Sequence, residues 1–257
     1  MQNGAKEKIQ EMRLSVITSV YNRPEILELT LLSLLRTEAT FDDFEVIVVC
    51  DGGYDGITCE SIQYGLLMNN MEVIELEKIS ARPGYARNVG FKASKGEIVA
   101  FVDSDFVHFS DPIQQTLDHF AQPKTYNDCL ISGEWYLIRK NWNGKQGYSM
   151  DTPPSVKNDR QTIPFAAWLA MNRNHFEEIG GFDDRYMYCA EDQKMNTCLH
   201  RKGLNFVKKP LIAIHQWYKE KGYRMPDKKQ LDWQLKDHKI FTGWKVNQGI
   251  DWGKIDG

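Results

Sequence analysis

The feature that most constrains the fold is an alternation of short apolar runs with stretches of helical spacing in the N-terminal half of the chain. The apolar runs, each readable as a buried strand, are Leu14–Val20, Phe44–Cys50, Met71–Leu76 and Glu97–Val102. Helices are expected after Pro24, over Thr58–Met68 and over Pro83–Ser94. Such short connections predict an α/β fold with a mostly parallel sheet and helices on both faces.

Composition limits the class of protein. The chain has 257 residues, of which 42% are hydrophobic and 26% charged, so it has room for one large α/β domain or two small ones, with a proper core. This composition excludes a disordered or fibrous chain. The formal net charge of −3 argues against a protein whose main partner is nucleic acid.

Cysteine usage and hydropathy bear on the compartment. The chain has 5 cysteines, an odd number, and no two have C-x-x-C spacing, which argues against a disulfide framework or a structural zinc site. The polar N-terminus lacks the apolar region of a signal peptide, and no apolar run reaches the about 18 residues that a membrane helix needs. We therefore expect a cytoplasmic protein with no transmembrane segment.

The pattern changes after Phe120. Gly133–Pro164 is long, polar and aromatic, which is typical of a functional or disordered loop. The ordered elements expected beyond it are a segment over Phe165–Met171, helices over Asn174–Ile179 and Glu191–Lys202, and a strand over Leu211–His215. The tail from Trp217 carries several tryptophans and many lysines; it could pack on the domain, form a dimer contact, or touch a membrane or an anionic acceptor.

Polar clusters follow three of the predicted strands. Tyr21–Arg23, Asp51–Gly53 and Asp103–Asp105 all lie at carboxyl ends, where ligands bind in parallel sheets. The D-x-D of Asp103 and Asp105 offers hard oxygen ligands suited to Mg²⁺ or Mn²⁺ bound to a diphosphate. The same residues also suit a solvated turn.

Three further features have both a functional and a structural interpretation. His215 ends an apolar strand and could bind Mn²⁺ or be structural. Glu191 and Asp192 open a helix, so one could be a general base, or both could complement the helix dipole. Arg82 and Arg87 near a helix start could bind phosphate or lie solvated at the surface.

Four segments together resemble the family 2-type glycosyltransferases with the GT-A fold. They are Ser15–Pro24 (SVITSVYNRP), Val46–Gly53 (VIVVCDGG), Ala81–Asp105 (with A-R-N-x-G and D-x-D) and Gly180–Asp192 (GGFDDRYMYCAED). The last segment is similar to the block of galactosyltransferase-like and chondroitin-polymerase-like members. Two departures stand out: Cys50 replaces an acidic residue before Asp51, and Tyr188-Cys189-Ala190 replaces a W-G-G lead-in.

The resemblance implies roles for the matched residues. The nucleotide site would comprise Val20, Tyr21, Asn22, Arg23, Asp51, Arg82, Arg87, Asp103, Ser104 and Asp105, with Asp51 on the base and the arginines near the base or diphosphate. Asp105 would coordinate Mn²⁺ or Mg²⁺ directly, Asp103 would assist through ribose or water, and His215 would be a further ligand. Asp192 would be the catalytic base and Glu191 would hold acceptor hydroxyls. Trp168 and Trp135 are candidates for stacking on sugars, or for burial in the core.

The resemblance also implies the domain division and the reaction. Residues 1–217 would form the GT-A domain, with a nucleotide-binding half (1–120) and an acceptor-binding half (121–217), and 218–257 would be a C-terminal extension. The expected reaction is metal-dependent, inverting transfer from a nucleotide-diphosphate sugar, with UDP favoured by the resemblance, to an acceptor hydroxyl. The acceptor could be a glycan, a lipid-linked sugar, a protein or a modified nucleic-acid base.

Three other classes fit the sequence less well. A nucleotidyltransferase usually has a Gly-rich loop where this chain has Tyr21–Pro24. A dehydrogenase would have G-x-G-x-x-G after its first strand, which is absent here. The third alternative is an inactive carbohydrate-binding or nucleotide-sugar-binding protein on the same fold, against which the intact D-x-D, the E-D pair and His215 argue.

Overall fold

The computed structural model describes residues 13–21, 23–52, 69–77, 82–137, 167–187, 190–216 and 227–254. The predicted helix over Thr58–Met68, most of the Gly133–Pro164 loop and the candidate ligand Asn22 therefore lie outside the described residues.

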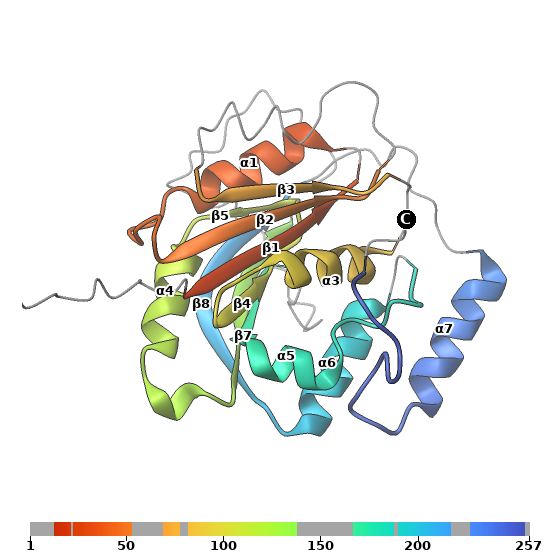
Figure 1. Cartoon of the computed structure of the whole chain (residues 1–257). Helices are drawn as coiled ribbons and strands as arrows, with labels where there is room; N and C mark the ends of the chain where they lie inside the picture. The colour runs from red at the N-terminus through yellow and green to blue at the C-terminus, as the bar shows by residue number, and fades with distance from the viewer. Residues whose placement is uncertain are drawn as a thin grey trace, which may run out of the picture.

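A mixed sheet in the order β3-β2-β1-β4-β7-β6-β8-β5 forms the centre of the molecule (Figure 1). Its strands are β1 (Leu14–Val20), β2 (Phe44–Cys50), β3 (Met71–Glu75), β4 (Ile98–Phe101), β5 (Phe106–His108), β6 (Asp128–Leu137), β7 (Leu169–Asn172) and β8 (Asn205–His215). The pairs within β3-β2-β1-β4 are parallel, as is β6 with β8. Strand β7 is antiparallel to β4 and β6, and β5 to β8, so the C-terminal half of the sheet is less parallel than the sequence predicts.

Helices cover both faces of the sheet, as predicted (Figure 1). They are α1 (Pro24–Leu34), α3 (Pro83–Ala93), α4 (Pro112–Phe120), α5 (Arg173–Ile179) and α6 (Glu191–Lys202). Helix α7 (Lys228–Ile240) lies to the side, beyond α6 and away from the sheet (Figure 1). Successive side chains of a strand point to opposite faces, so Val16 packs in the cluster under α1 and α4, while Ile17 packs in the cluster under α3, α5 and α6. Two separate hydrophobic cores result.

Helix α3 packs close against the sheet at Gly90. Pro83 occupies its first turn, where a missing amide hydrogen costs nothing, and Pro83–Phe91 are all buried. A Cβ atom on Gly90 would lie 2.7 Å from Cγ2 of Ile17 and 3.0 Å from Cγ2 of Val49. Glycine is needed at this point because a side chain would push the helix off the sheet.

The C-terminal segment runs back over the domain. Asp227 caps α7 by accepting a hydrogen bond from the Gln230 amide at 2.8 Å. Beyond α7, Val246 is buried in the core cluster beneath α3, α5 and α6, and Trp252 packs against the same cluster. No helix within the described ranges is long and apolar enough to span a membrane.

The cysteines differ in part from the sequence-based prediction. Cys50, at the end of β2, is disulfide-bonded, whereas Cys129 and Cys198 are free and buried. The sequence argued against a disulfide framework, and Cys50 shows that it did not argue against a single bridge. An odd count and the lack of C-x-x-C exclude neither a single bridge nor a longer spacing.

Candidate active site

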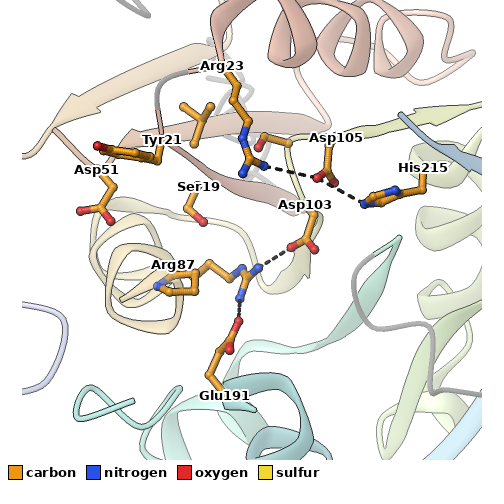
Figure 2. A pocket seen from close by; sticks show the side chains of 12 residues that line it. Ser19, Tyr21, Arg23, Asp51, Arg87, Asp103, Asp105, Glu191 and His215 are labelled. Carbon is orange, nitrogen blue, oxygen red and sulfur yellow. Dashed lines mark hydrogen bonds and ion pairs between the residues drawn. The ribbon is translucent and has the colours of Figure 1, made fainter. Parts of the chain in front are cut away.

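The carboxyl ends of β1, β2 and β4 meet at one edge of the sheet and bring three polar clusters together. The Asp51 amide donates to the Val20 carbonyl at 2.8 Å, which holds the ends of β1 and β2 side by side. A polar cavity of about 140 Å³ opens at this edge. Its lining residues are Ser19, Val20, Tyr21, Arg23, Asp51, Pro83, Arg87, Asp103, Ser104, Asp105, Glu191 and His215 (Figure 2).

His215 reaches this cavity through strand pairing. Strand β5 begins directly after the D-x-D, and its residue Phe106 pairs with His215 of β8 in an antiparallel register. The Gln216 amide then donates to the Asp105 carbonyl at 2.7 Å. The imidazole consequently lies beside the D-x-D, edge-on to the Phe106 ring at 5.0 Å between centroids.

Hydrogen bonds to α1 hold the D-x-D turn in place. The Thr30 hydroxyl, which is fully buried, donates to the Ser104 carbonyl at 2.7 Å. The Gln216 side-chain amide donates to the Ile26 carbonyl at 3.0 Å and to the Thr30 hydroxyl at 3.2 Å. Because these groups lie inside the domain, the backbone that carries the two aspartates has little freedom to shift.

One chain of charges crosses the upper part of the view in Figure 2. Asp105 Oδ2 lies 3.6 Å from an Arg23 nitrogen and 3.4 Å from His215 Nε2. Burial alone would lower the pKa of His215, but Asp105 and then Asp103 raise it above its usual value. An oxygen and an imidazole nitrogen at this separation can share a divalent cation. No three metal-binding side chains converge within the part of the chain that the structure describes, so such an ion would need ligands from substrate or water.

A second chain of charges joins Asp103, Arg87 and Glu191. The Arg87 guanidinium donates to the Asp103 carboxylate and, at 3.2 Å, to Glu191 Oε1 (Figure 2). Burial by itself would lower the pKa of Arg87, but the attraction of the two carboxylates is stronger than this effect and raises the pKa of Arg87 above its usual value. Burial raises the pKa of Asp103 to about 6 and that of Glu191 to about 7, although Arg87 opposes both shifts. This contact joins α3 and α6 to the D-x-D.

A smaller pocket lies against the same ion pairs. It is lined by Arg87, Phe101, Asp103, Leu169, Phe182, Glu191, Asp192 and Met195, and it holds about 40 Å³. Asp192 is half-buried and lines this pocket rather than the larger cavity. The two acidic residues at the start of α6 therefore differ in position: Glu191 lines both the larger cavity and the smaller pocket, whereas Asp192 lines the smaller pocket.

Most of the predicted site residues line the larger cavity, with few exceptions. Arg82 does not: its guanidinium donates to the Asp184 carbonyl at 3.1 Å and lies over the Tyr85 ring. Ser19 and Pro83 line the cavity although the sequence did not single them out; their places at a strand end and a helix start were the available signal. Trp168 is fully buried with its indole bonded to Thr116, so the sugar-stacking role suggested for it was wrong. The Trp135 side chain lies outside the described residues.

Residues 15–180 match a family model described as glycosyl transferase family 2. YfnE of Bacillus subtilis, an uncharacterized glycosyltransferase, is 24% identical over 262 residues, covering 80% of this chain and 65% of that protein. The poly(ribitol-phosphate) beta-glucosyltransferase of Bacillus spizizenii is 36% identical over 94 residues. That match covers 37% of this chain and only 15% of the relative.

Solved structures confirm the predicted GT-A fold. Staphylococcus aureus TarS 1–349 in complex with UDP superposes with a TM-score of 0.61 at 22% identity, covering 80% of this chain and 61% of that one. The mannosyltransferase PcManGT from Pyrobaculum calidifontis, in complex with GDP-Man and Mn²⁺, gives a TM-score of 0.57 at 16% identity. Coverage there is 88% of this chain and 61% of the neighbour.

Proposed function

The chain belongs to glycosyl transferase family 2, and we propose that it is a metal-dependent, inverting glycosyltransferase that uses a UDP-sugar as donor. One observation carries this proposal. The D-x-D, Asp51, Arg23 and His215 gather around a single polar cavity at the carboxyl edge of the sheet, where nucleotides bind in such folds.

The larger cavity suits a nucleoside diphosphate. Asp51 and Tyr21 lie together at one side of it, away from His215, and would hold the base (Figure 2). Arg23 and Arg87 reach toward the D-x-D, where planar guanidinium groups can bind a diphosphate. UDP is the proposed nucleotide because TarS, which has the same fold, is described in complex with UDP and with UDP-GlcNAc.

The residues around Asp105 fit a divalent cation. Asp105 and His215 would be its protein ligands, Asp103 would assist, and the diphosphate and water would complete the shell. When bound, the cation would stabilise the negative charge that develops on the leaving diphosphate. Mn²⁺ is the proposed ion, with Mg²⁺ as the alternative, because the PcManGT structure holds Mn²⁺ with its donor.

Asp192 is the proposed general base. It faces the smaller pocket, which shares Asp103, Arg87 and Glu191 with the donor cavity, so an acceptor there would lie next to the donor sugar. Asp192 would take the proton as the acceptor hydroxyl attacks the anomeric carbon, opposite the leaving diphosphate. Glu191, held by Arg87, would accept a hydrogen bond from the acceptor. Displacement from that side inverts the anomeric configuration.

Calorimetric titration with UDP, GDP and dTDP, with and without Mn²⁺, tests the donor site. We expect Mn²⁺-dependent binding of UDP that weakens by about tenfold or more in Asp105→Ala, because a charge-assisted contact is lost. The matched control is Asp118→Ala, which removes an exposed carboxylate on α4 and should bind like the unmutated protein. A folded, unmutated protein that binds none of the three nucleotides would overturn the proposal.

Turnover of Asp192→Asn tests the base. Loss of general-base catalysis should lower kcat by roughly 10²–10⁴-fold and leave the affinity for UDP unchanged. Gln193→Ala, at the next and exposed position of α6, serves as the control. If Asp192→Asn turned over at the unmutated rate and Glu191→Gln did not, the base would be Glu191 instead.

A further inference from the structure

We propose that residues 227–254 are a positioning element of the active site, acting through Asn247 and Asp237, which hold α3 and α6 in the arrangement that the Arg87–Glu191 contact requires. This inference rests on the proposed function for its catalytic consequence only. The matched family model ends at residue 180 and therefore does not include this segment.

Asn247 fixes the turn that lies between α5 and α6. Its side-chain amide donates to the carbonyls of Gly180, at 2.8 Å, and Phe182, at 2.5 Å. Its carbonyl oxygen accepts from the Asp184 amide at 3.2 Å. The residue has a φ of 51°, a left-handed conformation that asparagine and glycine tolerate better than other residues. One side chain thus satisfies three backbone groups of the turn.

The same turn is bound on its other side by α3. Asn88, which follows Arg87 and is fully buried, donates to the Phe182 carbonyl at 2.8 Å and accepts from the Phe182 amide at 2.9 Å. The Gly253 amide of the C-terminal segment donates to Asp184 Oδ2 at 3.1 Å, while Asn88 donates to Oδ1 of the same carboxylate. The turn is therefore held between α3 and the C-terminal segment.

Asp237 of α7 holds α6. Lys194, one turn beyond Glu191, is 1% exposed, and its ammonium lies 2.5 Å from Asp237 Oδ2. The Tyr186 hydroxyl donates to the same oxygen at 2.9 Å, and the ammonium lies 3.7 Å from the centre of the Phe241 ring. A buried lysine without its carboxylate would be strongly unfavourable, so α7 and the first turn of α6 are coupled.

Asn247 and Asp237, the two anchors of the C-terminal segment, act on opposite partners of the Arg87–Glu191 ion pair. Arg87 lies on α3 and Glu191 on α6, and a Cβ atom on Gly84 of α3 would lie only 3.5 Å from Glu191 Cγ. The strand-borne groups, Asp51, Asp105 and His215, are held by the sheet and do not depend on these anchors. Loosening the C-terminal segment should thus disturb catalysis more than nucleotide binding.

Two variants of the 257-residue chain test the inference: Asn247→Gly, which keeps the left-handed backbone and removes the three side-chain bonds, and Asp237→Asn. The control is Gln248→Gly, because Gln248 is exposed and bonds only within the segment. We measure the affinity for UDP with Mn²⁺, the release of UDP from a UDP-sugar per UDP-binding site, and amide hydrogen exchange. Normalising turnover to binding sites removes the effect of any unfolded fraction.

We expect both variants to lower turnover per site by about tenfold or more while the Kd for UDP stays within about twofold, since misplacement affects the reacting geometry. Exchange should become faster by about tenfold in the first turn of α6 and unchanged in β1 and β4. A lower melting temperature with unchanged turnover per site, or faster exchange spread evenly over the sheet, would reduce the segment to a general stabiliser and overturn the inference. If the unmutated protein binds no UDP, the proposed function fails. Amide hydrogen exchange in α6 then tests the positioning role without UDP.

Discussion

Arg87 lies between two carboxylates that are themselves largely removed from water. Replacing it by methionine leaves Asp103 and Glu191 buried without their cation, and breaking a buried pair this way lowers the free energy of unfolding by about 3–5 kcal/mol. The loss should be large at about pH 8 and smaller at about pH 5, because the pKa values of Asp103 and Glu191, about 6 and about 7, let both become neutral at the lower pH.

Urea unfolding at both pH values measures this difference for Arg87→Met. The control is Lys124→Met, at an exposed position of the chain, for which the two pH values should give the same small change. An equal loss at both pH values would show that packing, and not uncompensated charge, accounts for the role of Arg87.

His108 is buried beneath α1 and packs edge-on against Trp168. Neither ring nitrogen has a hydrogen-bond partner among the described residues, and burial lowers the pKa of His108 to about 3. The unfolded chain takes up a proton near pH 6.5 while the folded chain does not, so this residue removes stability as pH falls from about 6.5 to about 3.

His108→Phe should abolish that contribution. When the pH is lowered from about 7 to about 5, the free energy of unfolding should fall by about 2 kcal/mol less in the variant than in the unmutated protein. Urea unfolding at the two pH values measures this difference. His200→Phe, at an exposed site, is the matched control. Parallel pH profiles for His108→Phe and the unmutated protein would mean that His108 gains a proton in the folded state.

At the scale of elements, the close approach of α3 to the sheet can be tested by adding a methyl group at Gly90, which should change the free energy of unfolding. Gly90→Ala gains helix propensity of about 1 kcal/mol, but its Cβ would lie 2.7 Å from Ile17 Cγ2, and overpacking costs about 1–3 kcal/mol. Because α3 carries Arg87, which holds Glu191, we also expect a lower turnover per UDP-binding site. Gly243→Ala, whose Cβ would lie 3.6 Å from its nearest neighbours, is the control. A more stable Gly90→Ala would show that α3 can move outward freely.

At the scale of the whole molecule, the C-terminal segment shares a core with the sheet. Trp252 stacks on Phe91 at 5.6 Å and meets Phe176 edge-on at 5.8 Å. Trp252→Ala should lower the free energy of unfolding by about 2–3 kcal/mol, less than for a fully buried tryptophan because the ring is only partly buried. Trp244→Ala removes an indole that is 40% exposed and should have a much smaller effect.

The same packing predicts a single unfolding transition. Tryptophan fluorescence and far-ultraviolet circular dichroism should give coincident midpoints in urea, because the segment and the sheet lose their shared core together. Two separated transitions would mean that residues 227–254 unfold independently of the domain.

Much of the first half of the fold was predictable because the information is local. Strands β1 and β2 begin and end at the predicted residues, and Pro24 and Pro83 mark the starts of their helices. The convergence of Asp51 with the D-x-D also followed, since the carboxyl ends of parallel neighbours share one edge of the sheet. The resemblance of four motifs then supplied the family.

Only the tertiary structure decided the rest. The antiparallel register that pairs His215 with Phe106, the division of Glu191 and Asp192 between two pockets, and the anchoring of α6 by Asp237 join residues far apart in the chain. No local period encodes such contacts, because they depend on how whole elements pack. The sequence by itself determined which side chains could carry the chemistry and at which edge most of them lie; packing across the sheet and the C-terminal segment decided which of them meet.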